Sequence, residues 1–431
     1  MPQSSTRTPH VLIVSHNFPP ILGPDSVLMR MWALAIRRHG WRVTVLTTTD
    51  RHWNLKSDPG LLKDLPEDME ILRAPSPEAW LRRTPKLGAA VFKLSALCGL
   101  ADWHSGWKTM SMPRIRQWLK VNKPDIIYSR QPKHVSALVA MQIKKETGLP
   151  WVAHWSDMWA SLPYRERHTA RQWKSIDCLE AQEMKAVDAL FFVAQRAANL
   201  TLARYSGEVR QKATLIRHGY ETKPAELANT VRTGGSDALQ MVHAGAFYPG
   251  ISSPKGLFHA LASLHQERSL EGRFALHCVG PDTLELQPLV NSLGLDKIIT
   301  LEPMVPFKEA QARVAGADLL LVVPYDSTAM PTKLFEYMAF QKPMLGLALE
   351  DSDTTDVMKH CGLPVVRPDD SEGIATVMRG LLQQWESCTW GLSPTSLEAI
   401  EGYHVDHQAA VVSAVMHRLV RQRMPSANTL V

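Results

Sequence analysis

The chain of 431 residues has few cysteines and no long uninterrupted apolar run. Its five cysteines, Cys98, Cys178, Cys278, Cys361 and Cys388, are scattered and form no C-x-x-C pair, so neither a disulfide framework nor a zinc site is indicated. No apolar run reaches the roughly 18 to 20 residues that span a bilayer, and the polar start is not typical of a signal peptide. We expect a cytoplasmic protein, either free or peripheral on the cytosolic face of a membrane.

Several catalytic motifs are also missing. The 17 histidines contain no H-E-x-x-H, and no G-x-S-x-G elbow or RNA-binding motif occurs. We therefore predict no metal, no simple hydrolase and no nucleic-acid partner. Asp351-Ser-Asp353 spells D-x-D, but it falls in the acidic stretch from Glu350 to Asp356, and we interpret it as solvated surface.

The composition is that of an ordinary globular protein, with 45% hydrophobic and 21% charged residues. The length allows two or three domains with sizeable cores. A net charge of +6 and a pI near 9.0 suit an anionic partner, either a phosphorylated ligand, a membrane surface or nucleic acid.

Strand and helix patterns alternate in both halves of the chain. In the first half, residues 10–15 predict a buried strand, residues 26–39 a helix and residues 41–47 a second strand. In the second half, the strand at 239–244 leads through a glycine-containing loop to Lys255-Gly256 and a helix, which is typical of a phosphate cradle. Open α/β sheets bind ligands at such loops.

The most informative stretch is PTKLFEYMAFQKP, residues 331–343, which follows an apolar strand-like run. We expect Thr332 to be the N-cap of a helix that ends at Lys342-Pro343. The helix N-terminus would bind a diphosphate with the help of Lys333, and Glu336 would hold the vicinal hydroxyls of a ribose. The alternative is that Glu336 only complements the helix dipole and Lys333 is solvated.

This stretch resembles the donor-nucleotide motif P-S-K-x-x-E-Y-M-A-x-G-K-P of family-four retaining glycosyltransferases of the GT-B fold, also described as glycosyl transferases group 1. Thr328 stands where the family often has a second glutamate, and Gln341 replaces the usual glycine. The family also has an arginine before the K-G pair, which has no match here. The resemblance implies a donor site formed by Gly23, Lys255, Val305, Thr332, Lys333, Leu334 and Glu336.

The first half carries two further resemblances to the family. The segment His16 to Arg30 is similar to the family's opening motif and implies acceptor-side roles for His16, Ser26 and Arg30, with a structural turn as the alternative. The segment after the strand at 150–155 resembles the R-D-P-W of family members. It makes His154 and Asp157 catalytic candidates together with Lys255, although a histidine near a strand end is often structural.

Residues 80–125 combine an apolar helix, tryptophans and flanking cations. This pattern suits a segment lying in a membrane interface, as a lipid-linked acceptor would require. The alternative is a core helix followed by an exposed basic face.

Together these features predict an α/β protein of the GT-B fold, with two Rossmann-like parallel-sheet domains facing a central cleft and a C-terminal helix returning to the first domain. The predicted divisions are an acceptor domain (1–225), a linker (226–237), a donor-nucleotide domain (238–404) and the returning helix (405–431). The predicted function is retaining, metal-independent transfer of a sugar, with UDP favoured as the nucleotide, to a glycan or lipid-linked or other glycoconjugate acceptor. No cofactor is expected, because the nucleotide sugar is a substrate. A nucleotide-sugar-binding scaffold and an epimerase of the same fold are the alternatives.

Overall fold

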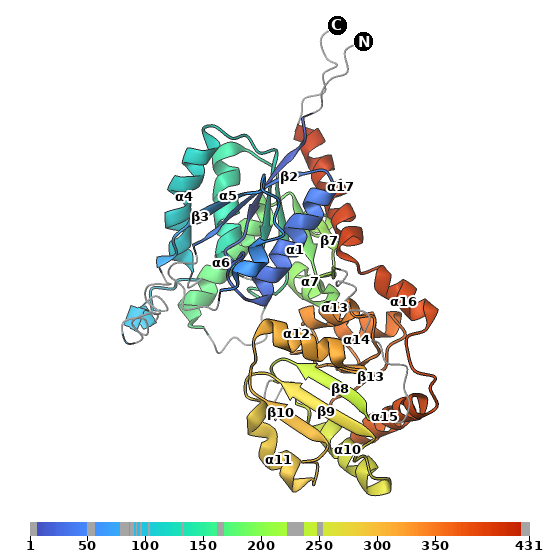
Figure 1. Cartoon of the computed structure of the whole chain (residues 1–431). Coiled ribbons are helices and arrows are strands. Elements are labelled where there is room, and N and C mark those ends of the chain that lie inside the picture. Colours follow the sequence, from blue (N-terminus) through green and yellow to red (C-terminus); the bar gives the residue numbers. More distant parts are fainter. Residues whose placement is uncertain are drawn as a thin grey trace, which may run out of the picture. The chain divides into compact units, whose positions relative to one another are not determined.

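The structure, a computed structural model, forms two compact units (Figure 1). Unit 1 comprises Met1–His218 and Val405–Val431, and unit 2 comprises Gly219–His404. The structure describes residues 7–49, 57–77, 86, 90–91, 93–94, 97–101, 104–131, 133–161, 168–221, 237–247 and 253–423. Of the predicted linker, only Asp237 lies among them.

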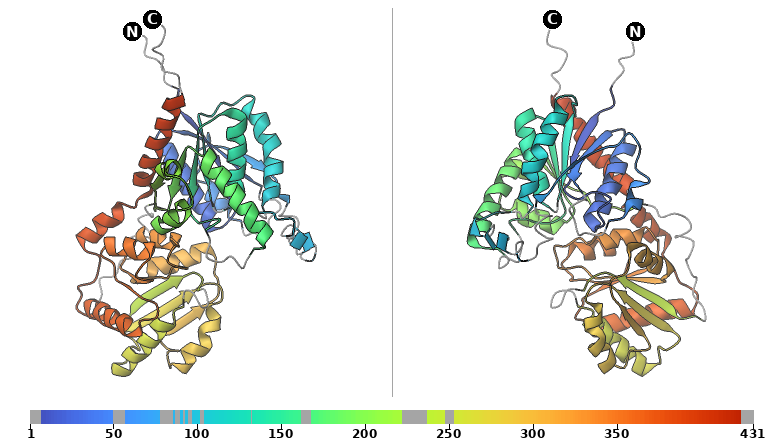
Figure 2. Two further views of the ribbon diagram at one scale, coloured as in Figure 1. Left: turned by 180° about the vertical axis from the view of Figure 1, so that it is seen from behind. Right: turned by 60° about the vertical axis from the view of Figure 1, so that its left-hand side comes forward.

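Unit 1 is built on a seven-stranded parallel sheet with the order β3-β2-β1-β4-β5-β6-β7. Its strands are β1 (His10–Val14), β2 (Arg42–Thr48), β3 (Glu70–Ala74), β4 (Ile126–Arg130), β5 (Trp151–Trp155), β6 (Ala189–Phe192) and β7 (Ala213–Leu215). The central strands are buried along their whole length because helices cover both faces of the sheet, which explains their continuous apolar sequences. Figure 2 shows these two helical layers.

Apart from the C-terminal helix, the helices of unit 1 connect consecutive strands, and together they border the two cores beside the sheet. They are α1 (Pro24–Arg38), the 3-10 helix η2 (Pro59–Leu62), α4 (Ser105–Leu119), α5 (Val135–Thr147), α6 (Ala170–Ala186), α7 (Gln195–Leu202), α8 (Gly207–Gln211) and α17 (Val405–Arg423). The last of these comes from the C-terminal end of the chain.

The C-terminal helix α17 is part of the unit 1 core, as predicted. Val405, Ala409, Val412 and Met416 are fully buried in the cluster that α1 also lines. The indole of Trp41 donates a hydrogen bond to the Ser413 hydroxyl at 2.8 Å, which adds a polar tie to the apolar contact. Figure 2 shows the helix running along unit 1.

Unit 2 repeats the arrangement with six parallel strands in the order β10-β9-β8-β11-β12-β13. The strands are β8 (Leu239–Ala244), β9 (Phe274–Val279), β10 (Ile299–Glu302), β11 (Leu319–Val322), β12 (Met344–Leu347) and β13 (Val365–Val366). The helices are α10 (Lys255–Glu267), η4 (Thr283–Leu286), α11 (Gln287–Ser292), α12 (Phe307–Gly316), α13 (Thr332–Met338), α14 (Asp353–His360), α15 (Ser371–Glu386) and α16 (Pro394–Glu401). The prediction of two Rossmann-like parallel-sheet domains is confirmed.

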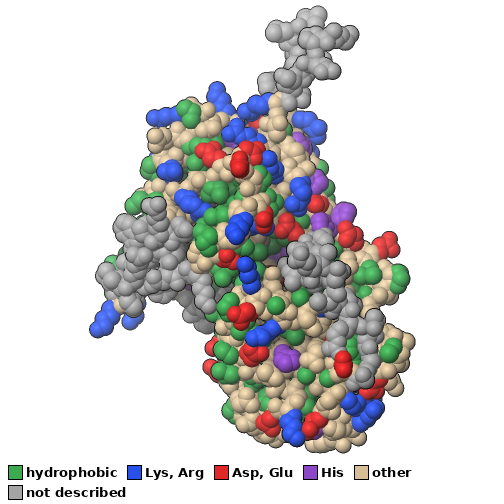
Figure 3. Space-filling view, viewed as in Figure 1, with side chains coloured by type: hydrophobic (Ala, Val, Ile, Leu, Met, Phe, Trp, Pro, Cys, Tyr) green, Lys and Arg blue, Asp and Glu red, His purple; other side chains and the backbone are tan. Residues whose placement is uncertain are grey.

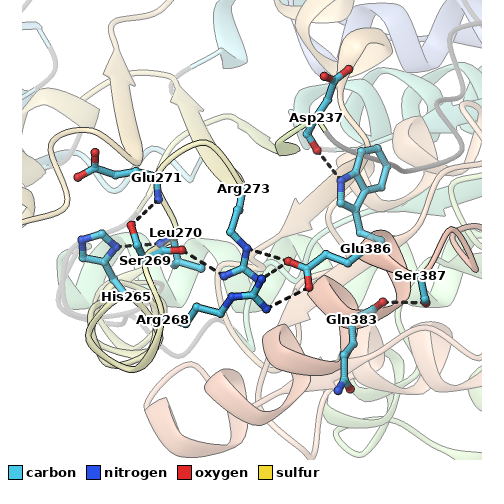
Figure 4. A network of polar contacts seen from close by, with 11 residues as sticks. Asp237, His265, Arg268, Ser269, Leu270, Glu271, Arg273, Gln383, Glu386 and Ser387 are labelled. Atoms are coloured by element: carbon cyan, nitrogen blue, oxygen red, sulfur yellow. Dashed lines mark hydrogen bonds and ion pairs between the residues drawn. The ribbon is translucent and has the colours of Figure 1, made fainter.

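A polar network fastens the amino-terminal edge of the unit 2 sheet (Figure 4). Glu386 at the end of α15 accepts hydrogen bonds from Arg273, just before β9, and from Arg268. The indole of Trp385 donates to the carbonyl of Asp237, two residues before β8. These contacts hold α15 to the strand starts, at the opposite edge from the loops that follow the strands.

Two predictions about residues 331–343 are wrong. The N-cap of α13 is Pro331, and Thr332 is its first helical residue, so no side chain caps the helix. The helix ends at Met338, before Lys342. The Lys342 ammonium is buried and donates to the carbonyls of Ala315 and Ala317, which satisfies backbone acceptors at the end of α12.

The structure of the D-x-D segment also differs from the prediction of solvated surface. Ser352 caps α14 through a hydrogen bond to the Thr355 amide, and Asp353 is fully buried at the first helical position. Asp351 is exposed, as expected. The segment is therefore a helix start, in which Asp353 complements the helix dipole.

The tryptophans of α4 face the protein interior. Trp107 is 0% and Trp118 is 7% exposed, and both belong to the core beside the sheet. Arg114, Arg116 and Lys120 are exposed. The tryptophans of α4 are thus core residues and not membrane anchors, and α4 has the basic outer face of the alternative interpretation; Trp103 lies outside the described residues. Among the described residues, no helix is long and apolar enough to cross a membrane.

Candidate functional site

In each sheet the order of successive strands reverses at a switch point, where two neighbouring strands lead to helices on opposite faces of the sheet. The switch lies between β1 and β4 in unit 1 and between β8 and β11 in unit 2. Ligands of open α/β sheets bind beyond the carboxyl ends of the strands at this point. The candidate residues below therefore belong to two groups, one at the carboxyl edge of each sheet.

In unit 2, Lys333 from the first turn of α13 reaches the end of β8. Its ammonium nitrogen lies only 1.1 Å from the place that a Cβ atom on residue 245 would occupy, so a side chain at position 245 would displace the end of Lys333 from this place. Burial lowers the pKa of Lys333 to about 8, although the Glu336 carboxylate acts in the opposite direction. The two loops predicted to bind phosphate thus meet at one partly buried cation.

The backbone around Gly245 is closely packed. A Cβ atom on Gly280, at the end of β9, would lie 2.0 Å from the Gly245 carbonyl oxygen. The Gly245 amide donates to the Val279 carbonyl at 2.7 Å, and the Ala244 amide donates to the Tyr337 hydroxyl at 3.0 Å. Tyr337 therefore fixes α13 to the end of β8 and positions Lys333, four residues earlier in the chain.

His243 lies beneath this turn as a buried, neutral side chain. Its ring stacks on Phe247 with centroids 4.3 Å apart, and its Nδ1 atom donates to the Leu321 carbonyl at 3.0 Å. Burial, followed by the charge of Lys333, lowers the pKa of His243 to about 3. An uncharged imidazole leaves Lys333 as the cation at this turn.

The other predicted donor residues occupy different environments. Glu336 is partly buried one turn after Lys333, and Leu334 is fully buried, so its side chain cannot contact a ligand. Thr332 is partly buried at the start of α13, and Val305 is partly buried in the loop between β10 and α12. Glu336 and Lys333 are thus the predicted pair that the structure brings together.

The K-G pair divides into two roles. Lys255 is exposed at the first position of α10. A Cβ atom on Gly256 would lie 2.1 Å from the Pro368 carbonyl oxygen, so this glycine permits close packing of α10 against the segment before α15. The loop between β8 and α10 lies partly outside the described residues.

Thr328, which replaces the family's second glutamate, belongs to a tight turn. One carboxylate oxygen of Asp326 accepts hydrogen bonds from the Thr328 amide and hydroxyl and from the Ala329 amide, at 2.7 to 2.8 Å. This loop therefore has its carboxylate at Asp326, two residues before the position of the family's second glutamate. The Asp326 carboxylate stabilises the turn that precedes α13.

In unit 1, the carboxyl edge gathers a cluster around Arg130, the last residue of β4. Its Nη1 atom lies 3.0 Å from Nδ1 of His154, and its Nη2 atom lies 3.2 Å from the Ser156 hydroxyl and 3.0 Å from Nδ1 of His218. The guanidinium also lies over the ring of Trp32, 5.6 Å from its centroid. Arg130 at the end of β4 thus forms hydrogen bonds with residues at the ends of β5 and β7.

His154 is completely buried in this cluster. The Tyr128 hydroxyl lies 2.6 Å from its Nδ1 atom, and Trp32 and Phe191 contact the ring edge-on. Burial, with the charges of Arg130 and His218, holds the pKa of His154 well below its usual value. The geometry is that of a neutral structural histidine, whereas Asp157, three residues later, is exposed.

The predicted acceptor-side residues make internal contacts. His16 is 1% exposed and packs edge-on against His104 and Trp107. Ser26 is fully buried. Arg30 binds the Leu61 carbonyl and the Asp64 carboxylate, and thereby holds α1 to the segment around η2.

Gly23 is the N-cap of α1, where its carbonyl accepts hydrogen bonds from the first turn. Its backbone is extended and nothing would contact an added Cβ atom, so the structure does not itself require glycine there.

A second buried group supports the segment that contains Asp157. Glu183 of α6 accepts hydrogen bonds from the side-chain amide of Gln131 at 2.9 Å and from the Trp155 indole at 2.8 Å. Its other carboxylate oxygen is buried without a partner among the described residues. Burial raises the pKa of Glu183 to about 8, so the carboxyl group is largely protonated at neutral pH.

Sequence reasoning missed Arg130 and Glu183. Arg130 could have been found as a charged residue at the end of a strand. Gly245 was predicted as part of the glycine-containing loop after the strand at 239–244, but its contact with Lys333, 88 positions later in the chain, was not predicted. Within the described residues, no group of three or more His, Cys, Asp or Glu side chains is placed to hold a metal ion.

Comparisons with known proteins give a consistent family. Residues 26–217 match the family described as Glycosyl transferase 4-like domain, and residues 238–384 match Glycosyl transferases group 1. A comparison with curated protein sequences finds no match. The two family matches together cover most of the chain, one in each unit.

Solved structures show the same fold at low sequence identity. Sucrose-phosphate synthase from Thermosynechococcus elongatus is 13% identical, with a TM-score of 0.64 over 96% of this chain and 100% of its own. Anabaena HepE in complex with UDP and glucose is 13% identical, with a TM-score of 0.60 over 95% and 99%. The lipopolysaccharide outer core galactosyltransferase WaaB is 15% identical, also with a TM-score of 0.60 over 95% and 99%. The chain therefore belongs to the group 1 glycosyltransferases of the GT-B fold, with a glycosyl transferase 4-like first domain.

Proposed function

We propose that this glycosyltransferase moves a sugar from a nucleotide-sugar donor to a glycan, lipid-linked or other glycoconjugate acceptor, with retention of configuration and without a metal ion. The observation that carries the donor site is the Lys333 ammonium, held against Gly245 at the switch point of unit 2 with Glu336 one turn away. A buried cation at the carboxyl edge of a parallel sheet suits a diphosphate.

The proposed chemistry follows from the group on which negative charge develops during the reaction. Cleavage of the bond between the sugar and the nucleotide diphosphate leaves negative charge on the diphosphate, which a preorganised cation stabilises. In the proposal Lys333 stabilises this charge, because Tyr337 anchors α13 to the end of β8 and the Lys333 ammonium lies against Gly245. Lys255, exposed at the start of α10, is the second proposed cation, and the family's upstream arginine has no counterpart here.

The ribose and base are proposed to lie beside this cation. Glu336 would accept hydrogen bonds from the ribose hydroxyls, with Val305 as the proposed base contact. UDP is the favoured nucleotide, and the HepE structure, which holds UDP, supports the choice through the common fold only.

On the acceptor side, Asp157 is the favoured catalytic residue, since it is exposed at the carboxyl edge of unit 1 whereas His154 is enclosed. Membrane contact remains a prediction for the residues before α4, where Leu94 is 59% and Leu97 is 65% exposed.

The first test is thermal unfolding of the full chain with UDP-, GDP- and ADP-sugars. We expect stabilisation by UDP-sugars that Glu336→Ala abolishes, because ligand binding stabilises the folded state by mass action. Glu398→Ala, an exposed glutamate on α16, is the matched control and should respond like wild type. No stabilisation of folded wild-type protein by any nucleotide sugar would contradict the donor site.

Turnover then separates the alternatives. Release of UDP only with an acceptor supports the transferase, conversion of the donor sugar without an acceptor supports the epimerase, and binding without turnover supports the scaffold. The anomeric configuration of an isolated product, determined by NMR, tests retention.

A further inference from the structure

Two carboxylates of α6 are enclosed in the interior of unit 1. Glu180 and Glu183 are both 0% exposed and lie one helical turn apart, so they share a face of the helix. On the face of the molecule that Figure 3 shows, acidic side chains lie at the surface among basic ones. A carboxylate is costly to bury unless hydrogen bonds compensate for the lost water, so the contacts of these two groups are informative.

Both carboxylates bind residues that flank Asp157. The Trp155 indole, two positions before Asp157, donates a hydrogen bond to Glu183 at 2.8 Å. The Ala160 amide, three positions after Asp157, donates one to Glu180 at 2.7 Å. One helix therefore holds the chain on both sides of Asp157.

The segment between these two anchors turns its other side chains inward. Met158 is 5% and Trp159 is 4% exposed, and Trp159 stacks on the ring of His134 with centroids 4.2 Å apart. Asp157 is exposed, although it lies between half-buried Ser156 and buried Met158. A carboxylate on a segment that is held at several points has a defined position, which a reacting group requires.

Glu183 is surrounded by uncharged donors and by Glu180. The side-chain amide of Gln131, just after β4, and the Trp155 indole both donate to one oxygen of its carboxyl group. His134, before α5, packs edge-on against the same indole. Burial is the main cause that raises the pKa of Glu183 to about 8, and the negative charge of Glu180 acts in the same direction.

The other titratable groups around this turn of α6 interact with Glu180. Arg204 and Tyr205, which follow α7, donate hydrogen bonds to its carboxylate at 2.9 and 2.8 Å. Asp177, earlier on α6, accepts a hydrogen bond from the same Arg204 guanidinium. Arg204 thus compensates the first carboxylate, and protonation of the second decides whether one or two negative charges are buried on this turn.

We propose that Glu183 is a positioning residue for sugar transfer: through the Trp155 indole it holds the segment that carries Asp157 at the carboxyl edge of unit 1. This inference rests on the proposed function, in which Asp157 is the favoured catalytic residue. Ionisation of Glu183 puts a second negative charge on the buried turn of α6. The segment then opens more readily, because access of water relieves both the repulsion and the cost of burial.

The test follows hydrogen exchange of the full chain by mass spectrometry, with labelling times scaled to the intrinsic exchange rate at each pH. Between pH 5.5 and 7.5, opening of residues 156–161 should increase about tenfold or more in wild type, because the open segment accepts the charged form of Glu183 and the closed one disfavours it. Glu183→Gln does not ionise and should change by less than about twofold. Glu208→Gln, at an exposed glutamate of α8, is the matched control and should behave like wild type.

Amides of β1, in the interior of the same sheet, separate local opening from unfolding of unit 1. If residues 156–161 exchange no faster than β1, the segment does not open by itself and the proposal is overturned. The same pH dependence in wild type and Glu183→Gln also overturns it. Should the variant fail to fold, the wild-type series decides: a constant opening between pH 5.5 and 7.5 contradicts the proposal, and an increase supports it.

Turnover gives a readout that a purely structural role would not change. With saturating UDP-glucose and octyl glucoside as a probe acceptor, the ratio of wild-type kcat to that of Glu183→Gln should fall about fivefold or more between pH 6 and 9. Loss of the Lys333 charge over this range affects both proteins equally and cancels in the ratio. A constant ratio overturns the proposal.

UDP-glucose binding keeps the two proposals distinguishable. Glu183→Gln should bind UDP-glucose within about twofold of wild type, because the donor site belongs to unit 2. Failure of wild type to bind UDP-glucose would contradict the proposed donor site, and binding without UDP release would contradict the proposed transfer. In either case the exchange series still decides whether Glu183 holds the segment.

Discussion

The carboxyl edges of the two sheets have the same topology but differ in their chemistry. In unit 2, a lysine lies directly on a glycine backbone, and neighbouring turns touch through main-chain atoms. In unit 1, an arginine is surrounded by two histidines, a serine and a tryptophan. The edge of unit 2 is therefore shaped mainly by backbone, and the edge of unit 1 by side chains.

Residue usage follows the same division. All of the 13 tryptophans except Trp385 and Trp390 lie in unit 1, whereas sixteen of the 24 glycines lie in unit 2. A backbone-lined site suits a diphosphate, which is common to all nucleotide sugars. A side-chain cluster can differ between related proteins without altering the sheet, which suits recognition of a particular acceptor.

The largest expected effect comes from Lys333→Met. Removing the enclosed cation should weaken UDP-sugar binding about 100-fold, because charge-assisted contacts in a partly buried site are strong. Lys255→Met is the matched control, and its effect should stay below about tenfold since Lys255 is exposed. Isothermal titration calorimetry measures both, and equal losses would show that the glycine-backed position gives Lys333 no advantage.

Glu183→Gln is a test in unit 1. We expect it to change the pH dependence of the free energy of unfolding by an intermediate amount. The folded-state pKa near 8 lies above the ordinary value of 4.5, so stability from this group is complete below pH 4.5 and is lost as pH rises through 8. Because glutamine does not ionise, the substitution removes this loss of stability with rising pH. Between pH 5.5 and 7.5, wild type should lose about 2 to 3 kcal/mol more than the variant.

Urea unfolding followed by tryptophan fluorescence checks this prediction, because the signal comes almost entirely from unit 1. Identical pH dependence of wild type and Glu183→Gln would mean that Glu183 is ionised in the folded protein.

The smallest expected effect is the pH dependence of donor binding. With a pKa of about 8, Lys333 is charged below that pH and loses its charge above it. UDP-sugar affinity should therefore be greatest below pH 8 and fall about threefold to tenfold by pH 9. Lys333→Arg stays charged over this range and serves as the control; a decline of the same size in this variant would assign the effect to another group.

Sequence periodicity predicted the alternating elements well, because fully buried parallel strands have continuous apolar sequences. β3 was not predicted, since its sequence EILRA is short and mixes apolar with charged residues. The tryptophans of α4 were misplaced for a related reason. Composition alone does not tell which face of a helix meets the core, and Trp107 and Trp118 pack inward beside the sheet.

The site was predicted where a local motif carried it and missed where distant segments meet. Lys333 and Glu336 lie within a single helix turn, so their spacing was visible in the sequence. Arg130 with His218, and Gly245 with Lys333, come together only through the sheet order. His154 was singled out by its position after a strand, but its enclosure by Trp32 and Phe191 depends on the folded core.

The contact between Lys333 and Gly245 also has a consequence for evolution. A side chain at position 245 would push the flexible end of Lys333 away from β8, and the φ of +159° at Gly245 is one that residues with a side chain rarely adopt. Glycine should therefore be conserved at position 245 in relatives that keep the lysine, although 87 residues separate the two positions in the chain, and also in relatives that do not.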